Sequence, residues 1–101
     1  MQPENVNPRN FEVEKIVFNN GSFSIAYGIW EEESNRLAMR WNGNLNDPKD
    51  VGYPKLFGNP TWFQISEELT EPILKSLIGL NGSNLDAIFD SIKMNENTLS
   101  E

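Results

Sequence analysis

Apolar and polar residues alternate over several short stretches of the chain, and this alternation predicts β-strands. Strands are expected over residues 11–18, 23–30, 36–41 and 61–65. Between the first two lies the Asn20-Gly21 pair, which favours a tight hairpin turn because both residue types tolerate positive φ. The pattern therefore predicts an N-terminal hairpin followed by two more strands.

Each predicted strand should present its side chains alternately to the two faces of a sheet. Over residues 23–30, one face holds small residues and one tryptophan, namely Ser24, Ala26, Gly28 and Trp30. Over residues 11–18, alternation places Phe11 and Val17 on a common face. The small residues leave room for another element or a partner to lie across their face of the sheet.

After residue 65 the apolar positions take the period of an α-helix. Ser66 precedes two acidic residues, as is typical of a helix start, and Pro72 suits the first turn of a helix that begins at Thr70. Four further apolar residues recur at helical spacing and predict one apolar face of a second helix: Leu85, Ile88, Phe89 and Ile92. Short antiparallel strands followed by helices are typical of an α+β domain. We therefore expect a four-stranded antiparallel sheet with two C-terminal helices packed on one face.

The chain of 101 residues has the length of one domain. Residues 1–10 contain two prolines and three asparagines, so we expect a flexible arm. Residues 11–93 should form the single α+β domain, and residues 94–101 a frayed tail. The chain starts without the features of a secretory signal, and no apolar run reaches the roughly 20 residues that cross a bilayer. We expect a cytoplasmic protein that does not bind membranes.

Residues 42–60 form a long connection rich in asparagine, glycine and proline. Connections longer than about 12–15 residues are uncommon in compact domains, and those that occur are often functional. We expect this loop to be ordered, because Tyr53 and Phe57 can pack it against the sheet. Any ligand site should lie beside it, since loops held on a rigid scaffold commonly carry binding residues.

The residue types exclude several kinds of chemistry. The chain has no histidine and no cysteine, which excludes Ser-His-Asp and Cys-His catalytic sites and thiolate-bound zinc. The acidic residues lie where strand surfaces and helix starts explain them, and no glycine-rich phosphate-binding motif occurs. We therefore expect a protein that is not an enzyme and has no catalytic residues, no metal site and no cofactor.

The net charge of −7 is distributed unevenly. Residues 34–60 hold four of the eight basic side chains but only two acidic ones, and large aromatic side chains lie among and just after them. Aromatic faces beside cations can stack on bases or hold a planar or cationic ligand; the same aromatics can instead fold the loop onto the core. The candidate ligand-binding residues are Arg36, Arg40, Trp41, Tyr53, Lys55, Phe57 and Trp62.

Two stretches carry a resemblance to known proteins. Trp41-Asn42-Gly43 and the segment Gly-Tyr-Pro-Lys-Leu-Phe-Gly-Asn-Pro-Thr-Trp-Phe at residues 52–63 resemble small uncharacterised proteins encoded on the mobile gene cassettes of bacterial integrons. That resemblance implies a bacterial accessory protein and brings no activity with it. The expected order of strands and helix is similar to the single-strand-binding fold of the positive cofactor four family, which implies a sheet that binds nucleic acid.

These observations favour a non-enzymatic binding or interaction module that forms a homo-oligomer, expected to be a dimer. Its partner would be a protein or a small ligand. One alternative is a protein that binds single-stranded nucleic acid through residues 36–57, although the net charge disfavours this because affinity for nucleic acid depends on neutralising phosphates. A second alternative is an acidic antitoxin or inhibitor that binds a basic protein.

Overall fold

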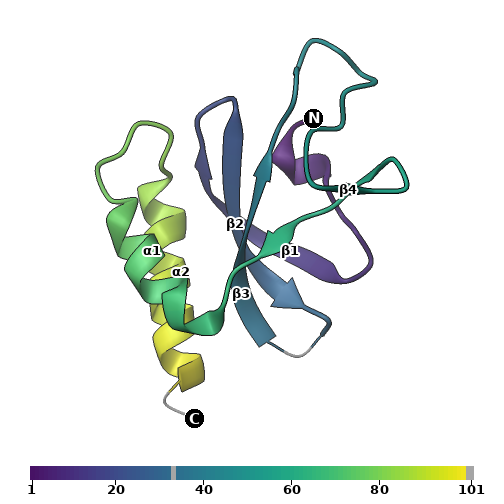
Figure 1. The fold of residues 1–101 in the computed structure, drawn as a ribbon. Coiled ribbons are helices and arrows are strands. Elements are labelled where there is room, and N and C mark those ends of the chain that lie inside the picture. Colours follow the sequence, from purple (N-terminus) through teal and green to yellow (C-terminus); the bar gives the residue numbers. More distant parts are fainter. Residues whose placement is uncertain (33, 100–101) are drawn as a thin grey trace.

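The computed structural model describes residues 1–32 and 34–99. It contains a four-stranded antiparallel sheet in the order β1-β2-β3-β6, followed in the chain by two helices, which confirms the expected α+β fold (Figure 1). The strands are β1 (Phe11–Asn19), β2 (Phe23–Trp30), β3 (Ser34–Trp41) and β6 (Phe63–Gln64). The helices are α1 (Thr70–Ser76) and α2 (Leu85–Leu99). None of the helices described is long and apolar enough to cross a membrane.

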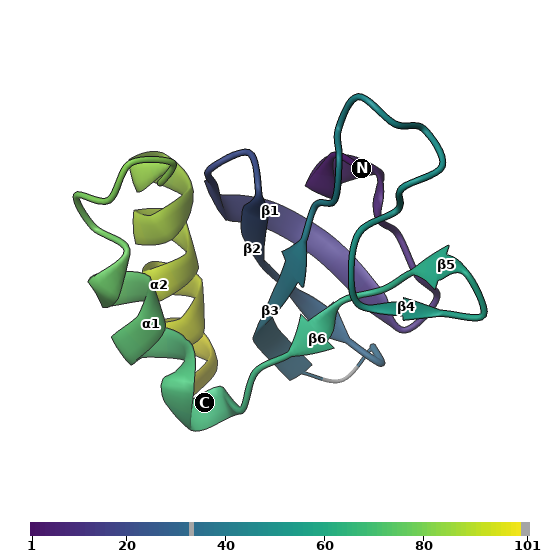
Figure 2. The same ribbon diagram turned by 45° about the horizontal axis from the view of Figure 1, so that its top comes forward.

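Four short elements complete the fold. Strands β4 (Lys55–Leu56) and β5 (Asn59–Pro60) form a separate two-stranded ribbon within the long connection between β3 and β6 (Figure 2). Two 3₁₀ helices, η1 (Pro3–Asn5) and η2 (Glu67–Leu69), lie near the N-terminus and just before α1. The structure is thus a sheet with helices on one side and a folded loop beyond its β3 edge.

The two helices cover one face of the sheet, as expected. The main core lies between them and the sheet, with Ile25, Tyr27 and Leu37 from the strands against Leu74 from α1 and Ile88 from α2. Burial of Tyr27 in this core raises the pKa of its hydroxyl. The helical layer therefore closes the central part of this face to solvent.

The second face of the sheet is covered by the N-terminal segment and by Trp62. A smaller core forms there from Val6, Phe11, Trp62 and the small residues Ala26 and Ala38. The indole Nε1 of Trp62 donates a hydrogen bond to the carbonyl oxygen of Val6, at 2.9 Å. Residues 1–10, expected as a flexible arm, thus contribute Pro3 and Val6 to the interior. Small side chains on the sheet make room for them.

Strand β1 departs from the simple alternation that the sequence predicts. Its pairing with β2 shifts register between Val13 and Lys15 and again between Ile16 and Phe18. Such irregularities reverse the face to which the following side chains point. Phe11 therefore packs in the smaller core and Val17 in the main one, so the prediction of a common face is wrong.

Helix α2 also differs from its prediction. Its buried face carries Ala87, Ile88 and Ser91, whereas Leu85 and Phe89, which belong to the predicted apolar face, are about half exposed. The helix continues to Leu99, so residues 94–99 of the predicted frayed tail are helical, and residues 100–101 lie outside the described residues. Small residues at the buried positions let α2 lie close to the sheet and α1, which turns the larger side chains outward.

Candidate ligand-binding site

Strand register places aromatic side chains in a row across the sheet, on the face that the helices cover elsewhere. Phe23 of β2 lies opposite Trp41 of β3, and Trp41 lies opposite Tyr53 of the following loop. The rings of Phe23 and Trp41 meet edge to face with their centroids 4.7 Å apart. Residues directly opposite one another in antiparallel pairs point to the same face, so the three rings form one row.

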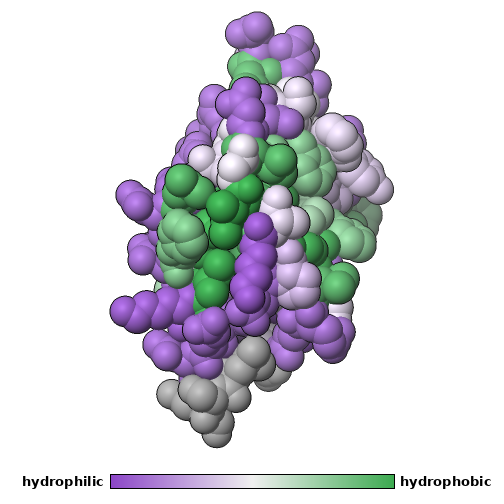
Figure 3. Space-filling model, turned by 90° about the vertical axis from the view of Figure 1, so that its left-hand side faces the viewer, coloured by the Kyte–Doolittle hydropathy of each residue, from purple (hydrophilic) through white to green (hydrophobic). Residues whose placement is uncertain are grey.

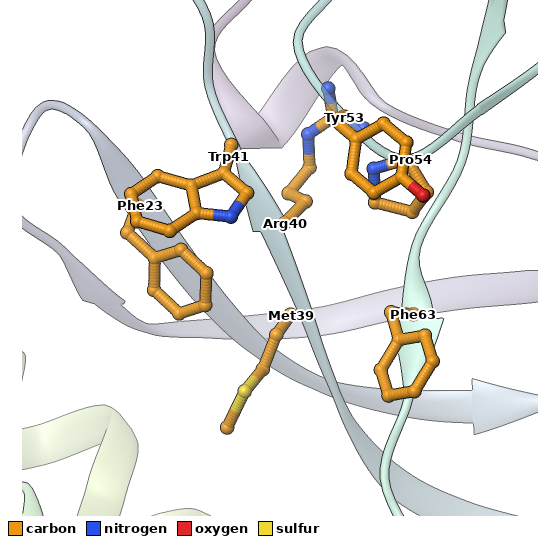
Figure 4. A pocket seen from close by; sticks show the side chains of 7 residues that line it. All are labelled: Phe23, Met39, Arg40, Trp41, Tyr53, Pro54 and Phe63. Carbon is orange, nitrogen blue, oxygen red and sulfur yellow. The ribbon is translucent and has the colours of Figure 1, made fainter.

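A second row lies next to the first. Met39, two residues before Trp41 on β3, pairs with Phe63 of β6. Two residues along a strand span roughly 7 Å, so the rows are about one ring width apart. We call the five side chains Phe23, Met39, Trp41, Tyr53 and Phe63 the aromatic platform. With Arg40 and Pro54, they line a shallow cavity of about 190 Å³ (Figure 4).

Much of the platform is open to solvent. Trp41 is 56% exposed, and Tyr53 and Phe63 are each 65% exposed. Phe23 and Met39 pack partly against the main core, which joins the platform to the helical layer. Neither the indole Nε1 of Trp41 nor the hydroxyl of Tyr53 hydrogen-bonds to another described residue, and Figure 4 shows the indole nitrogen on the side of its ring that faces the cavity. The platform thus offers apolar ring faces and two free donors.

Backbone hydrogen bonds hold the loop of residues 42–60 to the end of β3. The amide of Trp41 donates to the carbonyl of Tyr53 at 2.7 Å, and the amide of Tyr53 donates back at 3.0 Å. Gly52 makes this approach possible: its φ is +76°, and a Cβ there would lie 2.1 Å from the carbonyl oxygen of Trp41. Any other residue at position 52 would push Tyr53 away from the sheet.

Arg40 lies beneath this loop and anchors it. The residue is 1% exposed, and its guanidinium donates hydrogen bonds to the carbonyl oxygens of Val51 and Thr61, on either side of the β4–β5 ribbon. Its carbon Cζ lies 5.9 Å from the ring centroid of Trp62. Burial lowers the pKa of Arg40, and none of the ion pairs between described residues involves it. Arg40 is therefore a structural anchor of the loop, whereas the sequence analysis names it as a candidate ligand-binding residue.

Asp50 fixes the first part of the same loop. One of its carboxylate oxygens accepts a hydrogen bond from the amide of Asn44 at 2.9 Å, and the other from the amide of Gly52 at 3.0 Å. These two bonds, that from Asn44 first, hold the pKa of Asp50 below its ordinary value of 3.8. The charged carboxylate is thus the form that fits the folded loop.

This arrangement predicts that the loop loosens in acid. Because the pKa of Asp50 is lower in the folded loop than in the unfolded chain, its stabilising effect is complete above the ordinary value of 3.8. It is lost as the pH falls through the lower pKa of the folded state. Amide exchange of residues 43–52 should therefore accelerate below about pH 4 relative to the helices. In Asp50→Asn this acid-dependent difference should vanish; its persistence would show that another group causes it.

The candidate residues named from the sequence separate into different places. Arg40, Trp41 and Tyr53 come together around the cavity. Arg36 instead donates from Nε to Ser34 and pairs with Glu67 at 3.4 Å. The other three candidates do not line the cavity: Trp62 is buried on the second face, and Lys55 and Phe57 lie at the β4–β5 ribbon.

The exposure of Phe57 shows that aromatic packing does not order the loop. Phe57 is 95% exposed, and Tyr53 is also largely exposed, so the prediction that these two rings pack the loop is wrong. Arg40 and Asp50 fix the loop instead.

Sequence reasoning also missed four lining residues, which are Phe23, Met39, Pro54 and Phe63. Phe23 and Phe63 were identifiable only from the strand register, which decides which residues are neighbours.

Within the described part of the chain, no group of three or more acidic side chains is arranged to hold a metal ion. Comparison of the chain with protein-family models, curated proteins and solved structures finds no significant match. The site must therefore be interpreted from its own geometry.

Proposed function

We propose that this chain is a non-enzymatic binding module that recognises its ligand through the aromatic platform. The observation that carries the proposal is the exposure of Trp41, Tyr53 and Phe63 on one uncovered part of a sheet face. Exposed large apolar side chains gathered on one surface mark interaction sites. Tyrosine and tryptophan are common at such sites because each combines a large apolar ring with a polar tip.

The size of the cavity favours a ligand that extends beyond it. Its volume of about 190 Å³ is smaller than the roughly 300–1,000 Å³ typical of pockets that enclose a small molecule. Figure 4 shows Phe23 and Trp41 on one side of the cavity and Tyr53, Pro54 and Phe63 on the other. A chain-like ligand lying across both rows would cover more of the exposed ring surface than an isolated small molecule.

The charges around the platform disfavour a polyanion. Of the basic side chains in residues 34–60, Arg40 is buried and Arg36 is paired with Glu67. The whole chain carries −7, and binding of nucleic acid depends mainly on neutralising phosphates. A neutral or basic polypeptide therefore suits the platform better than single-stranded nucleic acid.

Titration of the isotope-labelled protein with indole, a neutral ring compound, tests the proposed site. The largest amide shifts are expected at residues 39–41, 53 and 63, because the ring should settle on the platform. Tyr53→Ala should weaken these shifts, whereas Phe57→Ala, which removes a more exposed ring outside the platform, should leave them unchanged. The largest shifts at the β4–β5 ribbon or the helices would contradict the proposal.

A fifteen-nucleotide oligothymidine, titrated at physiological salt, tests the main alternative. We expect no shifts at the platform. Salt-dependent shifts of the platform amides would instead favour the nucleic-acid function.

We further infer that the chain forms a homodimer through its helices. Apolar side chains gather on the outer face of the helical layer, bordered by hydrophilic ones (Figure 3). We call the exposed apolar residues of the turn after α1 and of the first part of α2 the helical patch; these are Ile78, Leu80, Leu85 and Phe89, each 44–54% exposed. Two helices, the longer about 22 Å, packed roughly 9 Å apart present a flat area of about 400 Å². This is about half of the roughly 800 Å² that each partner buries in a stable complex, so the proposed contact must extend beyond the two helices.

The charges on α2 support a second copy as the occupant of the helical patch. Asp86 lies three residues before Phe89 and Lys93 four residues after it, both exposed and neither in an ion pair between described residues. A two-fold axis near Phe89 would place Asp86 of each copy beside Lys93 of the other. The surface is therefore complementary to itself in charge.

Charge reversal provides the test. Asp86→Lys or Lys93→Asp alone should weaken dimerisation about tenfold, because like charges then face each other. The double variant should restore it, and Phe89→Glu should give a monomer of 11.5 kDa in sedimentation equilibrium. Phe57→Glu, at an exposed ring far from the helices, is the matched control and should not change the mass. A monomeric wild-type chain at 100 µM would rule out the dimer.

A further inference from the structure

We propose that the platform binds a proline-rich polypeptide segment in the polyproline II conformation. This rests on the proposed function and specifies the chemistry of its ligand. Polyproline II chains have no internal hydrogen bonds, and they present proline rings as apolar ridges. They dock in grooves lined by aromatic side chains, which is the type of surface that the two rows of the platform form.

The edge of β3 leaves no room for a ligand that adds a strand to the sheet. Beside the platform, Trp41 is bonded to Tyr53 in both directions, and Met39 pairs with Phe63. One step further, the amide of Ile65 donates to the carbonyl of Leu37 at 2.8 Å. A peptide that lies on the platform itself is therefore recognised through ring faces. Proline suits such a surface because it has no amide hydrogen that needs an acceptor.

The free polar tips of the platform are donors, and a polyproline II chain supplies acceptors. Trp41 and Tyr53 both line the cavity, and neither the indole Nε1 of Trp41 nor the hydroxyl of Tyr53 hydrogen-bonds to another described residue. In a polyproline II helix the backbone carbonyls point outward and are solvated. Two such carbonyls can therefore accept these bonds while the proline rings lie between the aromatic side chains.

Charge limits the ligand further. The cavity has no exposed cation in its lining, because Arg40 is buried and already bonded to two carbonyls. The lining therefore offers nothing to neutralise a phosphate or carboxylate group. A neutral or basic proline-rich segment carries no excess of negative groups that would need neutralising. The negative charge of the whole chain also favours the approach of a basic segment.

A decaproline peptide is the probe, and a glycine-serine peptide of equal length is the matched control. In amide-shift titrations of the full chain, decaproline should shift residues 39–41, 53 and 63 and displace indole, whereas the glycine-serine peptide should not. Trp41→Ala and Tyr53→Ala should each weaken decaproline binding about tenfold. Tyr53→Phe, which removes only the hydroxyl, should weaken it by a smaller factor. Phe57→Ala should leave it within twofold.

The outcomes distinguish this inference from the proposed function on which it rests. If indole binds the platform and decaproline does not displace it, the choice of ligand is wrong and the platform remains a binding site. If neither probe shifts the platform amides, both proposals fall. Equal binding of decaproline and the glycine-serine peptide would also overturn the inference, because the platform would then not distinguish proline.

Discussion

Trp62→Ala should lower the free energy of unfolding by about 3–5 kcal/mol, as is typical for removal of a buried tryptophan. Trp62 is 5% exposed and joins three parts of the fold. Its ring lies 5.9 Å from that of Phe11 in β1, it lies over the guanidinium of Arg40, and its indole bonds to Val6 of the N-terminal segment. Chemical denaturation followed by circular dichroism measures the loss.

Two further tryptophan variants control for this result. Trp62→Phe keeps a ring but loses the hydrogen bond to Val6, so it should cost about 1–2 kcal/mol and speed amide exchange around residue 6. Trp41→Ala removes the same side chain from an exposed position and should cost less than about 1 kcal/mol. Equal losses for Trp41→Ala and Trp62→Ala would show that the burial of the two residues is misassigned.

Arg40→Ala should have the second largest effect, a loss of about 3 kcal/mol. The substitution leaves the partly buried carbonyl oxygens of Val51 and Thr61 without their donor and opens a cavity beneath Trp62. Relief from burying a charge offsets part of this cost. The loss should be accompanied by faster amide exchange through residues 51–61, because Arg40 bonds to both ends of that segment.

Arg40→Met separates the hydrogen bonds from the packing. Methionine keeps an apolar stem beneath Trp62 but donates no hydrogen bond. We expect an intermediate loss of stability, with loop exchange almost as fast as in Arg40→Ala. If Arg40→Met has the stability and the loop exchange of the wild type, the guanidinium does not anchor the loop.

Local sequence features were enough to predict the general fold. The Asn20-Gly21 turn, the alternating strands and the helical spacing after residue 65 are short-range signals, and they predicted the four strands of the main sheet and the two helices in the right order, but not the β4–β5 ribbon. Part of the cavity lining could also be predicted, because Trp41 and Tyr53 lie in or beside the long connection after β3.

The features that could not be predicted from the sequence, namely the faces of the β1 side chains and the burial of several large residues, depend on tertiary contacts. The shifts of register in β1 send Phe11 and Val17 to opposite faces, and no residue type marks them in advance. The partners that decide whether a side chain is buried are also distant in the chain. Trp62 hydrogen-bonds to Val6, which is 56 residues away in the chain, and Arg40 hydrogen-bonds to Thr61, which is 21 residues away.

These distant contacts separate two groups of large side chains within the same stretch of sequence. Trp62 and Arg40 are used to hold the loop and the N-terminal segment on the second face of the sheet. Trp41, Tyr53 and Phe63 point to the other face, beyond the helices, and stay exposed. The fixed loop thereby keeps ring faces in position before any ligand arrives, which reduces the entropy cost of binding.

The most direct test of the central claim is a set of nuclear Overhauser contacts between carbon-labelled protein and unlabelled decaproline. The proposed function and its ligand predict contacts from proline ring protons to the ring protons of Trp41, Tyr53 and Phe63. Contacts confined to Phe57 at the ribbon or to Phe89 on the helical patch would contradict the account, because they would place recognition on a different exposed surface.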